Sequence, residues 1–399
     1  MRVKLMFWLL LIFQANANAQ YQKIDKRIED ALKTWESGND LEAYHIFSEI
    51  IRDRPFFAEA YFYRALVSEN AGDLQGALLD YNIQLELDPN NREGTFARGL
   101  LRYKLQLYDQ AKTDFKNLLF MPKGETRTIL YQRPSYQTGV SDILTQQSRQ
   151  DDLIYFHLGL ASIGSEEYLD AIQSFNQALK FDQFNPDYLL NRGRAKKMAG
   201  MTESAEEDFL LALAIDPYHP KGHQLLGELA RESGNFQKAE EYYSKSIAEE
   251  PEFILPYKQR GYQRLIGGQY EAALEDFEEV ISLQPNDVET LILRGNVLEK
   301  MGNWELAMRD YEKVLDLEST NAKAYFGKGN VHYQNNDFEQ AIGAYTLAIY
   351  YQEGFGEAYY QRGISNYRLD NKNLACQDLI EAMQHDIEAA KVGFNKICH

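Results

Sequence analysis

The feature that most constrains the fold is an alanine that returns every 34 residues. Ala43, Ala77 and Ala111 have this spacing, which resumes at Ala171 and continues to Ala375. Ala111 and Ala171 are 60 residues apart, which equals one period of 34 plus an insertion of 26. The chain of 399 residues is therefore predicted to contain ten similar repeats with one interruption.

Each repeat has the pattern of a tight helix pair. Gly or Ala stands twelve residues before every alanine, and the residue four positions after it is aromatic in nine repeats and Leu379 in the tenth. Small residues let two helix backbones approach closely, and the ring one turn along shares the alanine's face. Six repeats carry Gly in the predicted turn, and Asn336 and Asp370 tolerate the same conformation. Gln106 and Glu166 depart from this pattern, so these two turns are predicted to be built differently.

This order of small residue, alanine, aromatic residue and a later helix-ending proline resembles the tetratricopeptide repeat family. Residues 257–286, YKQRGYQRLIGGQYEAALEDFEEVISLQPN, match the pattern closely, and the resemblance covers 24–125 and 152–389. It implies a right-handed superhelical solenoid in which the first helix of each pair lines a concave face. We therefore expect an all-α fold of about ten helix-turn-helix repeats with a mid-chain insertion and a C-terminal capping helix.

The two ends and the interruption complete the predicted organisation. The insertion begins with TRTILYQRP, whose alternation indicates a strand or hairpin, and a short helix is expected from about Ser141. It is either functional or a packed lid over the joint. The predicted segments are a signal peptide at 1–19, repeats 1–3 at 20–125, the insertion at 126–151, repeats 4–10 at 152–389 and a cap at 390–399.

The first residues have the layout of a secretory signal peptide. Arg2 and Lys4 precede an apolar run at 5–13, and Ala17 and Ala19 offer small residues before a cut at Gln20. The run is too short to cross a bilayer as a lasting helix. We expect an exported protein, periplasmic or extracellular, without stable membrane insertion after cleavage; an uncleaved anchor is the alternative. Export would allow a disulfide between Cys376 and Cys398, the alternative being two separate thiols.

Six repeats combine an arginine in the first helix with an aspartate sixteen residues later. Every repeat that has this arginine also has the aspartate, which indicates structural ion pairs between the two helices of one repeat rather than six catalytic sites. The pairs are Arg64 with Asp80, Arg98 with Asp114, Arg192 with Asp208, Arg260 with Asp276, Arg294 with Asp310, and Arg362 with Asp378.

Catalytic and metal-binding motifs are missing from the sequence. It has no P-loop, dinucleotide glycine motif, zinc-type histidine pair or nucleophile elbow. His219 and His223 are four residues apart but are separated by Pro220 and Gly222, so they do not share a continuous helix. The net charge of −18 disfavours nucleic acid as a partner. We therefore expect a non-enzymatic protein without cofactor or metal.

Helical spacing and the family resemblance select two zones of the predicted groove. The first is aromatic and the second is basic, which would suit an acidic segment or a free carboxylate of a partner. The alternatives are that the aromatic rings pack between repeats and that the basic side chains are solvated and paired with glutamates. The candidate residues are Phe62, Phe96, Tyr103, Phe156, Asn191, Arg194, Lys197, Lys221, Arg231 and Lys258.

Some tetratricopeptide repeat proteins clamp a terminal carboxylate with lysines and asparagines. Asn191 and Lys221 occupy matching slots, but Phe156, Leu160 and Leu225 replace the remaining members, so the full clamp is absent. The expected function is therefore a scaffold or adaptor that binds a protein or peptide segment in its groove. A self-associating component of an envelope or surface assembly is the alternative, and the oligomeric state stays open. An active site in the insertion is a third hypothesis, disfavoured because 126–151 has no His or Cys.

Overall fold

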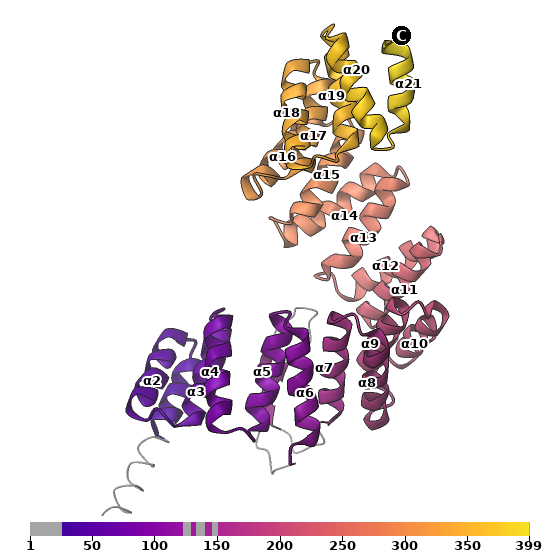
Figure 1. Cartoon of the computed structure of the whole chain (residues 1–399). Coiled ribbons are helices and arrows are strands. Elements are labelled where there is room, and N and C mark those ends of the chain that lie inside the picture. Colours follow the sequence, from indigo (N-terminus) through magenta and orange to yellow (C-terminus); the bar gives the residue numbers. More distant parts are fainter. Residues whose placement is uncertain (1–25, 123–128, 133–139, 146–150, 399) are drawn as a thin grey trace, which may run out of the picture. The chain divides into compact units, whose positions relative to one another are not determined.

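The computed structural model describes residues 26–122, 129–132, 140–145 and 151–398 (Figure 1). The predicted signal peptide lies outside these residues. The chain divides into two compact units, which we call the N-terminal and C-terminal units and which meet in the sequence between Pro217 and Tyr218. The repeat pattern had predicted one continuous solenoid. Each unit is described by itself.

The N-terminal unit contains repeats 1–5 and the insertion. Repeat 1 begins with a helix at 26–36, and each later repeat is a pair of helices joined by a short turn. The labelled elements are α2 (Asp40–Asp53), α3 (Ala58–Asn70), α4 (Leu74–Leu87), α5 (Arg92–Lys104), α6 (Tyr108–Phe120), β1 (Ile129–Gln132), β2 (Val140–Thr145), α7 (Asp151–Gly164), α8 (Tyr168–Phe181), α9 (Pro186–Met198) and α10 (Thr202–Ile215).

The C-terminal unit contains repeats 6–10 and a final helix. Consecutive helices contact one another along this unit, so the pairs stack in sequence order, as expected for the all-α repeat fold. Its helices are α11 (Pro220–Glu232), α12 (Phe236–Glu249), α13 (Ile254–Ile266), α14 (Tyr270–Leu283), α15 (Val288–Lys300), α16 (Trp304–Leu317), α17 (Ala322–Gln334), α18 (Phe338–Tyr351), α19 (Gly356–Arg368), α20 (Lys372–Gln384) and α21 (Glu388–Ile397).

The recurring alanines and rings form the core, as predicted. All ten alanines are fully buried, and so are the aromatic residues four positions later. The small residue of the first helix faces this ring: a Cβ added to Gly159 would lie 2.7 Å from the ring of Phe175. This distance is shorter than a carbon–carbon contact allows. The absence of a Cβ at this position therefore lets the two helices approach this closely.

The turn between the two helices has a residue with positive φ at the same position in all ten repeats. Gly72 has a φ of 86°, and Gln106 and Glu166 have φ angles of 60° and 61°. The prediction that these two turns differ is therefore wrong. The backbone N–H of Gln106 donates to the carbonyl oxygen of Tyr103, and that of Glu166 donates to the carbonyl oxygen of Ile163. These hydrogen bonds hold a non-glycine residue in the left-handed region.

The six predicted arginine–aspartate pairs are confirmed. Each arginine donates to both carboxylate oxygens of its aspartate, with a shortest distance of 2.6–2.7 Å, and the aspartate side chains are at most 8% exposed. Five of the arginines also donate to the second helix of the preceding repeat, as Arg64 does to Ser48 at 3.2 Å. Each of these five guanidinium groups therefore joins two neighbouring repeats as well as two helices.

The insertion contains an antiparallel pair of strands. Ile129 of β1 is opposite Thr145 of β2, and the register shifts between Leu130 and Gln132. The expected short helix from about Ser141 is wrong, because β2 occupies these residues; the β-branched Val140, Ile143 and Thr145 favour a strand. Repeats 3 and 4 still stack directly, since Lys112 of α6 binds Glu167, just before α8, at 2.8 Å.

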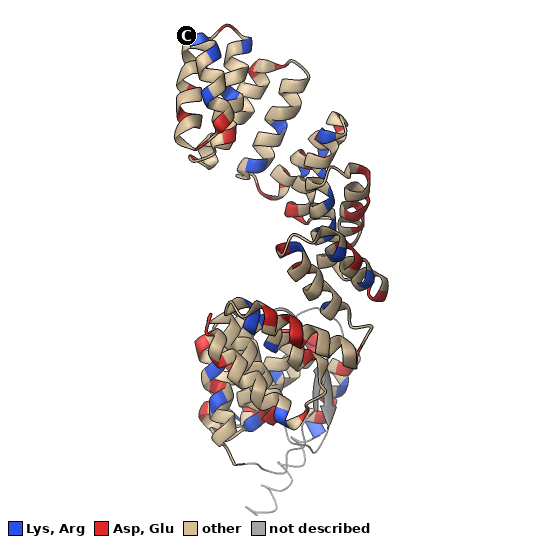
Figure 2. Cartoon of the chain, turned by 90° about the vertical axis from the view of Figure 1, so that its right-hand side faces the viewer, with Lys and Arg blue, Asp and Glu red and all other residues tan. Residues whose placement is uncertain are grey.

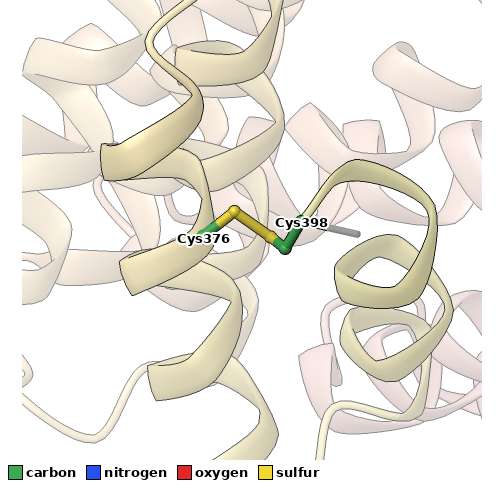
Figure 3. Close-up of a disulfide and its surroundings, with 2 residues drawn as sticks. All are labelled: Cys376 and Cys398. Carbon is green, nitrogen blue, oxygen red and sulfur yellow. A yellow bond between two sulfur atoms is a disulfide. The ribbon is translucent and has the colours of Figure 1, made fainter.

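The last helix, α21, covers the end of the stack. Ala390 and Ile397 are buried against Leu379 and Ala382 of α20. A disulfide joins Cys376 of α20 to Cys398, with a Cα–Cα distance of 5.8 Å (Figure 3). The two cysteines are therefore paired, and the bond ties the cap to repeat 10. No helix within the described part of the chain has the length and apolar character needed to span a membrane.

Candidate partner-binding surface

The predicted aromatic residues of the groove pack against the core. Phe62, Phe96 and Phe156 are half-buried, and their ring centroids lie 5.8–6.0 Å from the core rings of Tyr81, Phe115 and Phe175, respectively. Tyr103 is also half-buried and meets Tyr108 edge-on at 5.6 Å. These contacts lie within single repeats. Phe96 also meets His157 of repeat 4 at 5.5 Å, and Phe156 meets Tyr188 of repeat 5 at 5.1 Å, which supports the alternative in which the rings pack between repeats.

Three of the predicted polar residues lie on α9 of the N-terminal unit. Arg194 donates to the Oδ1 atom of Asn191 at 2.9 Å, and Asn191 donates to the carbonyl oxygen of Asp187 at 2.8 Å. The charge of Arg194 also acts on Tyr103 of α5, whose pKa is nevertheless raised because burial outweighs it. Lys197 is half-buried on the same helix. The charge of Arg194 in repeat 5 therefore acts on Tyr103 in repeat 3, with repeat 4 between them.

The other three basic residues lie in the C-terminal unit and have contacts of their own. The Lys221 ammonium lies 5.4 Å from the ring centroid of Phe253. Arg231 is 4.0 Å from Glu232, and the pKa of Tyr243 beside it is raised to about 12, mainly by burial.

Lys258 binds Asp287 at 3.3 Å and Glu289, so two carboxylates of the following repeat neutralise it. In Figure 2, acidic and basic segments are interspersed along the helices of both units.

A polar network that sequence reasoning missed lies on α15 and α17. The Tyr311 hydroxyl donates to Oε1 of Glu299 at 2.6 Å and lies 2.9 Å from Oδ1 of Asn296. Asn330 donates to Oε2 of Glu299 at 3.2 Å and accepts from the Tyr345 hydroxyl at 2.9 Å. Two core tyrosines thus fix three polar side chains of the first helices, and we call these five residues the Glu299 network.

Burial controls the protonation of this network. It raises the pKa of Glu299, although the two hydrogen bonds and the nearby charge of Lys300 act in the opposite direction. The pKa values of Tyr311 and Tyr345 are also raised, first by burial and then by the negative charge of Glu299. Both hydroxyls are therefore protonated donors at neutral pH.

Repeat 2 contains a related arrangement in the N-terminal unit. Glu69 of α3 occupies the slot of Glu299, and Lys104, the last residue of α5, lies 3.6 Å from its Oε1 atom. The core residue is Tyr81, whose pKa is raised by burial and by the charge of Glu69. In this repeat the chain itself supplies a cation for the buried glutamate.

The sequence does carry a signal for these polar positions. The core aromatic residue is tyrosine in only four repeats, and the residue twelve positions earlier is then Glu or Arg in three of them and Tyr333 in the fourth. Among the five repeats with phenylalanine, Lys197 is the only charged residue at that position. A core hydroxyl therefore accompanies a polar residue on the first helix. The four tyrosines are Tyr81, Tyr243, Tyr311 and Tyr345.

The histidines take structural positions. His219 caps α11 by accepting from the backbone N–H of Gly222 at 3.4 Å, and both His219 and His223 are buried. Among the described residues, no group of His, Cys, Asp and Glu side chains is arranged to hold a metal ion.

The solved structures that resemble this chain have low sequence identity to it. MamA (residues 41 to the end) from Desulfovibrio magneticus RS-1 is 23% identical over 42% of this chain and 94% of that chain, with a TM-score of 0.39. A tetratricopeptide repeat protein from Parabacteroides merdae is 17% identical over 63% and 100%, with a TM-score of 0.47. PilF of Pseudomonas aeruginosa is 18% identical over 51% and 93%, with a TM-score of 0.46. A search of curated proteins finds no match.

Family models match both units. One model described as tetratricopeptide repeat matches 35–92, and a second with the same description matches 220–253 and 322–355. A third model, described as TPR repeat, matches 261–302 and 295–336. These segments coincide with helix pairs that carry the buried alanine and ring. The matched segments are therefore tetratricopeptide repeats, and the other helix pairs carry the same alanine and core residue.

Proposed function

We propose that this chain is a non-enzymatic scaffold that binds a segment of a partner protein along the first helices of its repeats. Proteins built from tetratricopeptide repeats generally serve as protein-interaction scaffolds. In the C-terminal unit the first helices α13, α15, α17 and α19 contact one another in succession, and in the N-terminal unit α5, α7 and α9 do so. Within each unit these helices form a continuous surface long enough for an extended or helical segment.

The Glu299 network is the observation that carries this proposal. Asn296 and Asn330 occupy the slots that Leu66 and Leu100 fill in repeats 2 and 3, so stacking alone does not require polar groups there. Desolvating amides and a carboxylate in an apolar stack costs stability. Such groups, held in place by hydroxyls from the core, are suited to binding polar atoms of a partner.

An acidic partner segment is what the five predicted basic residues would favour. The contacts of Lys258 argue against that preference in the C-terminal unit, because a side chain already bound to two carboxylates gains little from a third. We therefore leave the acidic partner out of the proposal for this unit.

Selection of random peptides displayed on phage tests the scaffold proposal. Peptides selected on the full chain should slow hydrogen exchange in first helices such as α15 and α17 and leave second helices such as α16 and α18 unchanged. Protection confined to second helices, or the absence of any selected peptide, would contradict the proposal. Mass measurement across a concentration range separates it from self-association.

We also propose that the protein is exported. The signal-like residues at 1–19 support this, and so does the disulfide between Cys376 and Cys398, because disulfides persist in oxidising compartments. Cell fractionation with sequencing of the mature N-terminus should find the protein outside the cytoplasm, beginning at Gln20. An intact Met1 on a cytoplasmic protein with reduced cysteines would contradict export.

A further inference from the structure

Glu299 is a half-buried carboxylate without a cationic partner. None of the described Lys, Arg or His side chains lies within ion-pair distance of it, and its two oxygens accept only from the Tyr311 hydroxyl and the Asn330 amide. Each oxygen can still accept at least one further hydrogen bond. Placing a charge in this environment costs free energy that a bound cation would offset.

Repeat 2 shows which cation this position accepts. The ammonium group of Lys104 lies 3.6 Å from Glu69, which is equivalent to Glu299. Lys104 lies 35 residues after Glu69, and the residue 35 positions after Glu299 is Gln334. Gln334 is exposed at the end of α17 and carries no charge. The C-terminal unit therefore has the carboxylate of this pair but lacks its lysine.

We propose that the Glu299 network is a subsite for a lysine side chain of the partner, whose ammonium group takes the place that Lys104 occupies in repeat 2. This inference rests on the proposed function, because it names one residue of the segment that the first helices bind. The ammonium would donate to the free acceptor positions of Glu299, and the Oδ1 atom of Asn296, which already lies 2.9 Å from the Tyr311 hydroxyl, offers a further acceptor.

Lysine fits this subsite better than arginine. Repeat 2 presents a lysine, not an arginine, to the equivalent Glu69, at a distance of 3.6 Å. A compact ammonium can approach a single oxygen. The net charge of −18 also favours the approach of a basic segment.

The experiment compares the full chain with three variants in the same peptide selection. Glu299→Gln keeps the shape and removes the charge, and Gln334→Lys supplies the cation from within the chain. Glu305→Gln is the matched control, since this carboxylate begins the adjacent helix α16 and is 81% exposed. Thermal unfolding and circular dichroism establish that all three variants fold.

A selected peptide is then synthesised with an acetylated N-terminus and titrated by calorimetry, with its lysine intact or replaced by norleucine or arginine. We expect lysine to be enriched, and norleucine, Glu299→Gln and Gln334→Lys each to weaken binding at least about tenfold, the usual effect of losing a charge-assisted hydrogen bond. Arginine should bind more weakly than lysine, and Glu305→Gln should bind as the parent chain does.

Other outcomes would overturn the inference. Peptides that protect the first helices but lack enriched lysine, or that bind Glu299→Gln within about twofold of the parent, would exclude the subsite and leave the scaffold proposal intact. Loss of binding on acetylation, with norleucine tolerated, would assign the site to a terminal amine instead. Selection of no peptide at all would contradict both proposals.

Discussion

Replacing His157 should remove a large part of the acid sensitivity of the N-terminal unit. The imidazole ring of this α7 residue is surrounded by phenylalanines, with ring centroids 5.5 Å from Phe96, 5.8 Å from Phe115 and 5.3 Å from Phe156. Burial in this setting lowers the pKa of His157 from 6.5 to about 4. The folded chain therefore holds the ring neutral at pH values where the unfolded chain protonates it.

The sign and size of the effect follow from linkage. Above pH 6.5, His157 is neutral in both states and does not lower the free energy of unfolding. As the pH drops from 6.5 towards 4, the free energy of unfolding falls, because only the unfolded state gains a proton in this window. One pKa unit corresponds to about 1.4 kcal/mol, so the shift is worth up to about 3 kcal/mol by pH 4. The carboxylates of the chain add their own pH dependence, which a variant at this position leaves in place.

The assay compares the parent chain with His157→Phe in urea unfolding at pH 7 and pH 4, with hydrogen exchange in α7 as the local probe. Phenylalanine fits among the neighbouring rings and cannot be protonated. Between pH 7 and pH 4, the free energy of unfolding of the variant should therefore drop by about 2–3 kcal/mol less than that of the parent chain. An identical loss in both proteins would refute the reasoning, since it would mean that the ring is solvated in the folded state.

Three further predictions concern the repeat framework and its cap. Gln106→Gly and Glu166→Gly should each raise the free energy of unfolding by about 0.5–1 kcal/mol in denaturant titrations, because both residues have positive φ angles; no change would mean that the turns impose no strain. Asp310→Asn should lower the free energy of unfolding by about 2–3 kcal/mol, because it leaves the partly buried guanidinium of Arg294 without its carboxylate. Retained stability would show that the ion pair is dispensable. Cys398→Ser opens the link across 22 residues and should speed hydrogen exchange in α21 by a factor that corresponds to about 2–3 kcal/mol, with α15 as the unaffected reference.

The fold was predictable because its signals are local and repeated. A buried alanine, a facing glycine and a ring recur at fixed spacing, and the arginine–aspartate pairs recur with them, so each position was observed many times in one chain. The turns at Gln106 and Glu166 were predicted incorrectly, because residue type alone suggested another conformation there. The hydrogen bonds of the neighbouring helix residues determine these turns. The division between the two units has no counterpart in the spacing.

The candidate surface was harder to predict because it depends on contacts between repeats. Lys258 has the spacing of a groove residue, but Asp287 and Glu289 of the next repeat neutralise it, which no pattern within one repeat reveals. The four aromatic candidates have the helical spacing expected of groove residues, and their rings also contact the core. Glu299 escaped notice because carboxylates are abundant in this chain, and only its burial and its lack of a cation distinguish it.

The core aromatic position connects stacking with recognition. Phenylalanine and tyrosine fill the slot behind the small residue of the first helix equally well, so stacking does not choose between them. Tyrosine adds a hydroxyl that extends from the core towards the first helix, where it reaches Glu299 from Tyr311 and Asn330 from Tyr345. A buried hydroxyl needs a partner, so a tyrosine at this slot favours a polar residue on the first helix, and that residue is then held in place. Exchange of one core ring for the other can therefore change what the surface binds while the repeat itself stays intact.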